Sequence, residues 1–379
     1  AWGMPADATA ETPPATMRAV VVEGGALSVG EVPTPRLRPG EVLLAVKATA
    51  LNRADLSQAA GNYPPPPGES EVLGLEAAGV VVAGDAAVMA EAGVQLGGAY
   101  TALLPGGGYA EYVAVPAAML IPVPAGWTWA QAASLPEAAF TAYLNLFMEA
   151  GLKGGERVLV HGGASGVGSY ATLLAKRAGC TVYATAGGPE KCAACVRFGA
   201  DVAIDRHARP FEEVVLEHGG GQGVDVILDI VGEEYFAANL EALATGGRLV
   251  FIATLGGRRI QVDVRELMTR RLKLIGSTLR HRPLAEKLRI KQEFLARFGD
   301  DRVDVVSEGD FIPVGSTIKV LRVEGSRVTV RKVESSGAQA SSPAAAGATA
   351  IAGSQTLNAD TATLADNDQS PADDGRKEA

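Results

Sequence analysis

A glycine-rich segment near the middle of the chain limits the possible folds more than any other part of the sequence. Residues 156–170 read ERVLVHGGASGVGSY, so the apolar run Val158–Val160 enters glycines and a helix is predicted from about Val167. The glycines are Gly163, Gly166 and Gly168. Glycine lets a backbone approach a pyrophosphate, and the start of a helix offers free N–H groups to it. The spacing is not the usual G-x-G-x-x-G, but the flanking strand and helix favour a dinucleotide site over a structural glycine turn.

Short apolar runs alternate with segments of helical spacing between residues 130 and 278. The runs are Arg157–Val160, Thr181–Ala184, Val202–Ile204, Val224–Asp229, Arg248–Ile252 and Leu272–Gly276. This alternation is typical of right-handed strand–helix–strand units around a parallel sheet that is buried on both faces. It predicts a doubly wound α/β domain. Residues 281–299 are predicted to form one charged amphipathic helix after it.

The part of the chain before this domain, from Met17 to about Pro124, has the pattern of a compact β domain. Short β-rich runs are separated by proline and glycine, and no long helical pattern occurs between them. These runs are Ala19–Val22, Val42–Ala48, Ala78–Val82 and Tyr109–Val115. The run Pro64–Pro67 predicts a rigid loop, because proline cannot donate a hydrogen bond to a sheet.

The two ends of the chain differ in composition from the rest. Residues 1–16 are rich in Ala, Thr and Pro, and residues 334–379 hold seven acidic and two basic residues with few large apolar side chains. We expect a disordered extension and a disordered acidic tail, because such segments bury too little surface to offset the entropy of ordering.

The net charge of −9 argues against nucleic acid as a partner. No apolar run reaches the ~18 residues of a membrane span, and the three clustered cysteines favour a reducing, cytoplasmic location.

The end of the second predicted α/β strand bears on the choice between NADH and NADPH. Sites for NADH usually place a carboxylate there to bind the ribose 2′-hydroxyl. This chain instead reads ATAGGPEK over residues 184–191, with no acid at the tip of the strand. Lys191, and Arg206 beyond the third strand, are candidates to bind a 2′-phosphate, although each could be an ordinary solvated base. The sequence therefore favours NADPH.

Seven short motifs occur in an order and spacing that together indicate a family. They are NRAD (52–55), GNYPPPPG (61–68), GGGYAE (106–111), LPEAAFTA (135–142), DIVG (229–232), FIATLGG (251–257) and GSTLR (276–280). The chain resembles the zinc-free, zeta-crystallin-like quinone oxidoreductases of the medium-chain dehydrogenase/reductase superfamily. Within that family it looks closest to the subgroup of the p53-inducible quinone reductase homologue.

The resemblance implies a GroES-like β domain over residues 17–130 and a Rossmann domain over residues 131–300, with NADPH in the cleft between them. By analogy, Asn52, Tyr63 and Thr141 would lie near the nicotinamide and the substrate. Asn52 and Tyr63 are the catalytic candidates, and the Tyr63 hydroxyl would orient the acceptor or relay a proton. Thr141 could instead pack a helix, and Tyr63 could be an exposed loop aromatic. The remaining cofactor-binding candidates are Gly163, Ala164, Ser165, Gly166, Val167, Gly188, Lys191, Arg206, Val231, Gly232, Ile252, Ala253 and Leu255.

The implied activity is the reduction of a small quinone by NADPH without a metal. Zinc-dependent relatives carry Gly-His-Glu where this chain has Gly-Leu-Glu at 74–76, so no metal is expected. The alternatives are a reductase of activated alkenes, such as enones or enoyl thioesters, and a non-catalytic NADPH-binding scaffold. Cys192 and Cys195 on a predicted helix, and His161 at a strand end, are interpreted as packing residues.

The resemblance to this family ends at about Phe298. There the family returns to its first domain with a strand, a helix and a final strand, none of which the sequence contains. Residues 301–333 alternate polar and apolar residues and resemble about half of the OB-type β module of NfeD-like proteins, which predicts a short atypical β segment. Arg259–Val264 and Leu272–Thr278 resemble the sheet edge of family dimers, so a homodimer is expected.

Overall fold

The computed structural model describes residues 13–299, 305–307, 318–324 and 327–332. The contacts within the chain define two compact units, which are Ala1–Arg302 (unit 1) and Val303–Ala379 (unit 2). Residues 1–12 of the expected N-terminal extension and the expected tail 334–379 lie outside the described residues. Residues 13–16 are described, and Thr16 already belongs to the first strand. None of the described helices is long and apolar enough to cross a membrane.

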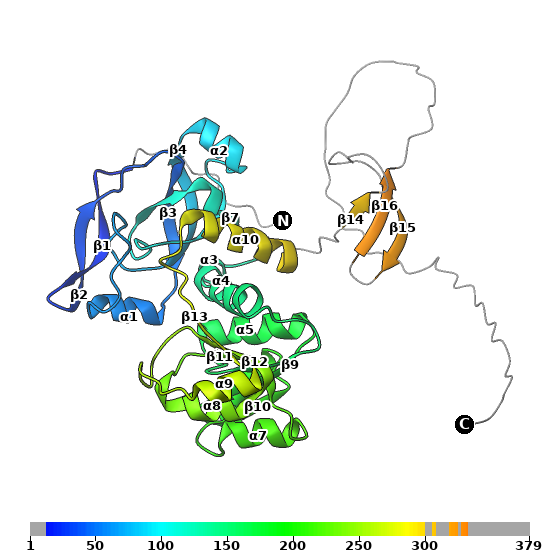
Figure 1. Ribbon diagram of the computed structural model, residues 1–379. Coiled ribbons are helices and arrows are strands. Elements are labelled where there is room, and N and C mark those ends of the chain that lie inside the picture. Colours follow the sequence, from blue (N-terminus) through cyan, green and yellow to red (C-terminus); the bar gives the residue numbers. More distant parts are fainter. Residues whose placement is uncertain (1–12, 300–304, 308–317, 325–326, 333–379) are drawn as a thin grey trace, which may run out of the picture. The chain divides into compact units, whose positions relative to one another are not determined.

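An antiparallel sheet and a separate hairpin form the first part of unit 1 (Figure 1). The strands are β1 (Thr16–Glu23), β2 (Ala26–Pro33), β3 (Glu41–Thr49), β4 (Glu76–Gly84), β5 (Ala99–Leu103), β6 (Tyr112–Pro116) and β7 (Ile121–Pro122), with helices α1 (Arg53–Ala59), α2 (Ala86–Ala92) and η1 (Ala117–Met119). The sheet order is β6-β3-β4-β5-β7, and β1 pairs with β2. Backbone bonds from Val20 N to Tyr109 O and from Glu111 N to Arg18 O attach the hairpin to the loop before β6.

A six-stranded parallel sheet of order β10-β9-β8-β11-β12-β13 forms the second part. Its strands are β8 (Arg157–Val160), β9 (Thr181–Ala186), β10 (Val202–Asp205), β11 (Val224–Asp229), β12 (Leu243–Phe251) and β13 (Lys273–Gly276). The helices of this part are α3 (Trp129–Ala133), α4 (Pro136–Tyr143), the π-helical turn η2 (Leu144–Glu149), α5 (Gly166–Arg177), α6 (Pro189–Arg197), α7 (Phe211–His218), η3 (Glu233–Tyr235), α8 (Phe236–Ala242), α9 (Val264–Arg270) and α10 (Leu284–Phe298). The predicted α/β fold is therefore confirmed.

Burial of the central strands on both faces explains their short, continuous apolar sequences. Val158 and Val160 of β8 belong to the core shared with Ala171 and Leu174 of α5. Leu159, which lies between them, packs into a second core with Val215 of α7. Side chains alternate across a strand, so both faces of β8 need apolar residues.

Helix α10 packs back toward the first part of the unit. It contacts α4 and η1, and its residues Phe294 and Phe298 join an aromatic cluster with Phe140, Tyr143 and Phe147. Ring centroids in this cluster lie between 5.4 and 6.1 Å apart, which is the usual range for aromatic pairs. The helix predicted over 281–299 is thus shorter by a few residues, because Pro283 precedes its first turn.

Three described strands lie in unit 2, namely β14 (Val305–Ser307), β15 (Ile318–Glu324) and β16 (Arg327–Lys332). They form a sheet of order β14-β16-β15, in which β14 and β16 are parallel and β15 and β16 antiparallel. The short β segment expected after residue 300 therefore has strands at these described positions.

Candidate active site

The glycine-rich loop joins β8 to α5 through a tight and specific geometry. A Cβ on Gly163 would lie 2.7 Å from the Ala184 Cβ, and a Cβ on Gly168 would lie 2.1 Å from the Gly162 carbonyl oxygen. Only glycine fits at such close approaches. The Ser165 hydroxyl accepts a hydrogen bond from Gly168 N at 3.1 Å and so caps α5.

The outer side of the same loop is open. Ser165 and Gly166 are exposed, and a Cβ on Gly166 would meet nothing closer than the Ala138 Cβ at 4.0 Å. Free N–H groups at the first turn of a 12-residue helix therefore face a space that an anion can enter. An open helix start of this kind offers the N–H groups that the pyrophosphate of a dinucleotide needs, so Gly163–Val167 stay the candidates for that role.

Residues behind the loop are structural. His161 is fully enclosed, with Nδ1 3.0 Å from the Thr185 hydroxyl and Nε2 2.7 Å from Asn239 Oδ1. Burial lowers the pKa of His161 to about 4, so the ring stays neutral near pH 7. Cys195 is buried below the loop, and burial raises the pKa of its thiol to about 11. Both observations agree with the packing roles expected from the sequence.

Two further loops meet at the carboxyl ends of β11 and β12. The Asp229 carboxylate accepts hydrogen bonds from Val231 N (2.6 Å) and Gly232 N (3.1 Å), which fixes the loop after β11. Gly256 N donates to Val231 O at 2.7 Å, and a Cβ on Gly232 would lie 2.4 Å from Gly257 O. The structure therefore brings the candidates Val231 and Gly232 beside the loop that holds Ile252, Ala253 and Leu255, at the strand ends where such sheets bind ligands.

The tip of β9 carries the candidates for recognising a 2′-phosphate. Gly188 has a φ of +88°, and Lys191 and Arg206 are both exposed. The Arg206 Nε and His207 Nε2 atoms would lie 3.4 and 3.2 Å from a Cβ on Gly187. The sequence analysis missed Asp205, whose Oδ1 accepts from Gly188 N and His207 N at 3.0 Å. These backbone N–H groups lower the pKa of Asp205.

Asn52 lies in a polar network on the first-domain side of the site. Its backbone N–H donates to Asp55 Oδ2 at 2.7 Å, and its Nδ2 donates to Glu76 Oε1 at 2.8 Å. The other Glu76 oxygen accepts from Glu137 N at 2.8 Å, at the start of α4. Because the next residue, Ala138, is the neighbour of Gly166, α4 joins this network to the glycine-rich loop. The Thr141 side chain makes no hydrogen bond to any described residue, and its carbonyl accepts a hydrogen bond from the Asn145 side chain.

Two carboxyl groups of this network, those of Glu76 and Glu137, have raised pKa values. Burial raises the pKa of Glu76 to about 7, against hydrogen bonds from Asn52 and Glu137 N that lower it. Burial, with the nearby charges of Glu76 and Asp55, raises the pKa of Glu137 to about 8. Sequence reasoning did not identify Asp55, Glu76 or Glu137 as site residues, although the motifs NRAD and LPEAAFTA contain the first and the last of them. Such perturbed groups are a mark of functional sites.

Tyr63 is held in place by Arg280, a buried arginine from a distant part of the sequence. Arg280 is 3% exposed and donates to Pro105 O (2.8 Å), Tyr63 O (3.1 Å) and Gln58 Oε1 (2.8 Å). Its guanidinium also lies 5.2 Å from the centre of the Tyr63 ring. Tyr63 is therefore not the free loop aromatic that was its alternative interpretation.

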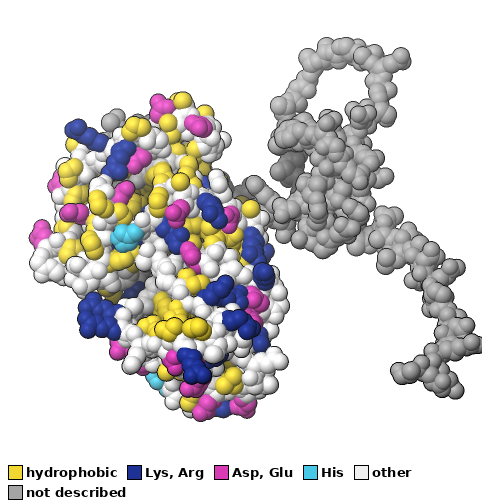
Figure 2. Space-filling model, viewed as in Figure 1, with side chains coloured by type: hydrophobic (Ala, Val, Ile, Leu, Met, Phe, Trp, Pro, Cys, Tyr) yellow, Lys and Arg dark blue, Asp and Glu magenta, His cyan; other side chains and the backbone are white. Residues whose placement is uncertain are grey.

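Figure 2 shows a hollow between the upper and lower parts of unit 1, with basic side chains beside it.

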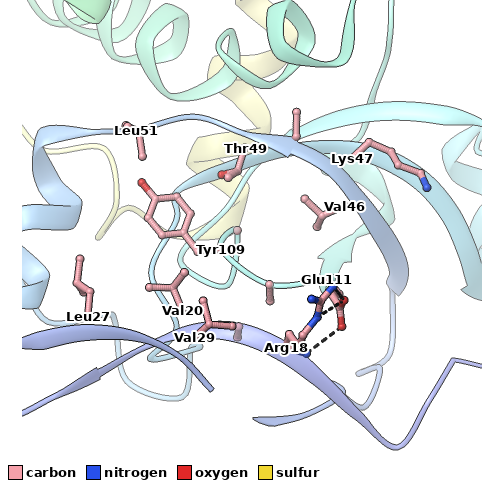
Figure 3. A pocket seen from close by; sticks show the side chains of 14 residues that line it. Arg18, Val20, Leu27, Val29, Val46, Lys47, Thr49, Leu51, Tyr109 and Glu111 are labelled. Carbon is pink, nitrogen blue, oxygen red and sulfur yellow. Dashed lines mark hydrogen bonds and ion pairs between the residues drawn. The ribbon is translucent and has the colours of Figure 1, made fainter. Parts of the chain in front are cut away.

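A separate apolar groove of about 580 Å³ lies between β1, β2 and β3 (Figure 3). The groove exposes Leu27 (54%), Val29 (73%) and Leu51 (88%). Tyr109 closes one side of it, with its hydroxyl donating to Asp55 Oδ2 at 2.6 Å. The groove is thus distinct from the glycine-rich loop.

In the part of the chain that the structure describes, no three His, Cys, Asp or Glu side chains are arranged to hold a metal ion. Leu75, which occupies the position of the histidine in the Gly-His-Glu motif of zinc-dependent relatives, is buried in the core.

Comparison with known families assigns both parts of unit 1. Residues 38–125 match the alcohol dehydrogenase GroES-like domain, and residues 166–297 match the zinc-binding dehydrogenase family. Residues 274–332 match the NfeD-like C-terminal, partner-binding domain, so this match begins within the Rossmann sheet.

Two solved structures are similar over most of their length. The quinone oxidoreductase of Thermus thermophilus, solved alone and with NADPH, is 34% identical, with 74% of this chain and 86% of that chain covered and a TM-score of 0.62. The mycobacterial protein Rv1454c, solved with NADPH, is 31% identical, with 77% and 92% covered and a TM-score of 0.66.

Much larger proteins also contain a similar region. The pikromycin polyketide synthase component PikAII of Streptomyces venezuelae is 39% identical over 224 residues, which is 56% of this chain but 6% of that protein. The mycocerosic acid synthase-like polyketide synthase of Mycobacterium tuberculosis is 35% identical over 215 residues, or 10% of its length. The match thus spans a tenth or less of these relatives.

The assignment follows from the solved structures, because this chain is at least 31% identical to both and covers 86% or more of each. Together with the GroES-like and dehydrogenase matches, this shows that the chain belongs to the medium-chain dehydrogenase/reductase family of oxidoreductases, in its zinc-free quinone oxidoreductase type.

Proposed function

We propose that this chain is an NADPH-dependent reductase of small quinones. The glycine-rich loop is the observation that carries the proposal. The protein leaves open space beside Gly166, whereas backbone and side-chain atoms pack closely against Gly163 and Gly168. NADPH is the cofactor of two solved relatives. When bound, it supplies the hydride, and the protein supplies binding and orientation.

The residues take their roles from their positions. Gly163, Ala164, Ser165, Gly166 and Val167 hold the pyrophosphate at the start of α5. Val231, Gly232, Ile252, Ala253 and Leu255 line the nicotinamide end, because they lie at the carboxyl ends of β11 and β12. Asn52 and Tyr63 would orient the acceptor, and Thr141 on α4 would lie near the nicotinamide.

Turnover tests the proposal directly. Fluorescence titration of the purified chain is expected to show NADPH binding, and 1,2-naphthoquinone is expected to cause NADPH oxidation. Binding without oxidation would favour the alternatives of an alkene reductase or a scaffold. No binding would contradict the site assigned to the glycine-rich loop.

Cofactor preference gives a second test. Lys191→Ala is expected to raise the Kd for NADPH about tenfold and leave the Kd for NADH unchanged, because a lysine acts on the 2′-phosphate as a point charge. Arg197→Ala, an exposed base on the same helix α6, is the matched control and should change neither. Equal losses for both cofactors in Lys191→Ala would contradict a role at the 2′-phosphate.

An activated alkene is the second candidate acceptor. The 39% identity to part of a polyketide synthase favours it, and the CurK enoyl reductase shares the fold at a TM-score of 0.64. The same hydride geometry serves quinones and enones, so their relative rates with one enzyme preparation separate the two.

A homodimer through the Rossmann sheet belongs to the same proposal. Among the described strands, β13 pairs only with β12, so its other edge is open. The neighbouring helix α9 exposes Val264 (64%) and Met268 (72%). Pairing of two copies along β13 would cover both features.

A further inference from the structure

Glu76 is a buried carboxylate that joins three elements beside the proposed site. It is the first residue of β4 and is 1% exposed, and the Thr49 hydroxyl donates to its carbonyl oxygen at 2.7 Å. The two side-chain oxygens of Glu76 have different donors. Oε1 accepts from Asn52 Nδ2 at 2.8 Å, and Oε2 accepts from Glu137 N at 2.8 Å. With one donor on each oxygen, the carboxylate is held in a single orientation.

The hydrogen bond to Glu76 fixes which end of the Asn52 amide faces the carboxylate. A carboxylate oxygen only accepts, so the Asn52 nitrogen, and not its oxygen, lies against Glu76. That nitrogen carries two hydrogens, and Glu76 is its one hydrogen-bond partner among the described residues. Asn52 is half-buried and not sealed in the core, so a bound molecule can contact the second N–H. The contact with Glu76 therefore makes Asn52 offer a donor there instead of an acceptor.

The backbone of Asn52 is held independently of Glu76. Its N–H donates to Asp55 Oδ2 at 2.7 Å, and the same oxygen accepts from the Tyr109 hydroxyl at 2.6 Å. A change at Glu76 would therefore release the Asn52 amide without releasing its backbone. This separates the orientation of the amide from the stability of the surrounding structure.

The same carboxylate connects Asn52 to the proposed cofactor site. Glu137 N, which donates to Glu76, lies in the first turn of α4. The next residue, Ala138, is the neighbour of Gly166 in the glycine-rich loop. Asn52 is therefore linked through Glu76 and α4 to the loop where the pyrophosphate is proposed to bind.

We propose that Glu76 is a positioning residue, which orients the Asn52 amide so that its second N–H donates to the acceptor oxygen that becomes negative. This rests on the proposed function. Hydride transfer brings one hydrogen and two electrons to the quinone and leaves a negative charge on a quinone oxygen. A proton from water then completes the hydroquinone, and Asn52 gives up no proton. A fixed donor aimed at the developing charge stabilises the transition state more than the bound quinone.

Glu76→Gln tests the orientation, because a glutamine has one accepting oxygen and one donating nitrogen. Glu137 N can only donate, so the glutamine oxygen must face it, and the glutamine nitrogen then faces Asn52. The Asn52 amide must turn over to avoid two opposed donors, and its oxygen lone pairs then point toward the acceptor. We expect kcat with 1,2-naphthoquinone to fall about 100-fold with KM nearly unchanged, because the lost interaction belongs to the transition state. A wild-type kcat in folded Glu76→Gln would overturn the proposal.

A double variant shows whether Glu76 acts through Asn52. Asn52→Ala removes the donor and is also expected to lower kcat about 100-fold. In that background Glu76→Gln should change kcat by less than about twofold, because there is no amide left to orient. If the two losses multiply instead, Glu76 acts by another route and the proposal is wrong.

Glu41→Gln is the matched control. Glu41 is the first residue of β3, and its carboxylate accepts a backbone N–H from Arg38 at 2.8 Å, as Glu76 does from Glu137. This variant should keep the wild-type kcat and KM. Burial raises the pKa of Glu76 to about 7, against the hydrogen bond from Asn52 that lowers it, so assays at about pH 8 keep Glu76 mostly ionised.

Urea midpoints and NADPH titrations establish that each variant is folded. If Glu76→Gln does not fold, Asn52→Ala decides alone, and a wild-type kcat in that variant would overturn the proposal. A wild-type chain that binds NADPH but reduces no quinone would contradict the proposed function itself. That result differs from an active wild type with an equally active Glu76→Gln, which contradicts only the role of Glu76.

Discussion

Replacing Arg280 with alanine is expected to lower the free energy of unfolding by about 3–5 kcal/mol, since hydrogen bonds to a charged group contribute about 1.5–3 kcal/mol each and are not fully additive. The substitution removes all three donated bonds and leaves Pro105 O, Tyr63 O and Gln58 Oε1 without their donor. It also empties a position that is 3% exposed. Because one of these bonds holds Tyr63, the KM for the acceptor should rise in any protein that remains folded.

Urea unfolding, followed by fluorescence, measures this loss. Arg282→Ala is the matched control two residues away, because Arg282 is partly exposed and its ion pairs with Glu149 and Glu286 are near the surface. We expect it to cost about 1 kcal/mol or less. Arg280→Lys should fall between the two, since an ammonium keeps the charge but cannot reach three separate acceptors. Equal urea midpoints for Arg280→Ala and Arg282→Ala would show that the three bonds contribute little to stability.

The parts of the structure that sequence reasoning predicted are those governed by local patterns. Val158–Val160 forms β8 and the helix begins at Gly166, within a residue of its predicted start. The sequence predicts these elements because the spacing of the apolar side chains reveals the strand and the helix. The glycines between them pack against atoms that are close in sequence or lie on the adjacent strand. The start of β12 was less predictable. It begins at Leu243 instead of Arg248, because the strand continues through an irregularity between the pairs Val224–Leu243 and Val226–Arg248, where Gly246 has a φ of +82°.

The network beside the site could not be predicted in this way. Asp55, Glu76 and Glu137 come from three separate elements, and Arg280 reaches Tyr63 across 217 positions of sequence. Their meeting depends on how β4, α4 and the segment after β13 pack, which no local spacing encodes. The motifs contained most of these residues, but a motif gives the identity of a residue and not its charge neighbours. The burial that raises the pKa values of Glu76 and Glu137 is a property of the assembled fold.

Gly168→Ala is expected to destabilise the Rossmann part by about 3 kcal/mol or more and to abolish NADPH binding. The new Cβ would lie 2.1 Å from Gly162 O and 2.8 Å from the Gly163 Cα. Both obstacles are backbone atoms, so no side-chain rotation relieves the overlap, and α5 must move away from the loop. That movement breaks the bond from Gly168 N to Ser165 Oγ and opens the anion site at the start of the helix.

Gly166→Ala separates folding from binding at the same loop. Its Cβ meets nothing within the protein closer than 4.0 Å, and alanine is a better helix former than glycine, so the urea midpoint should match or exceed that of the wild type. The Cβ would nevertheless occupy the open side of the loop, where the proposed pyrophosphate lies, so the Kd for NADPH should rise at least tenfold. A Gly168→Ala chain with wild-type stability would mean that the loop and α5 can separate freely. Unchanged NADPH binding by Gly166→Ala would mean that the phosphates lie elsewhere.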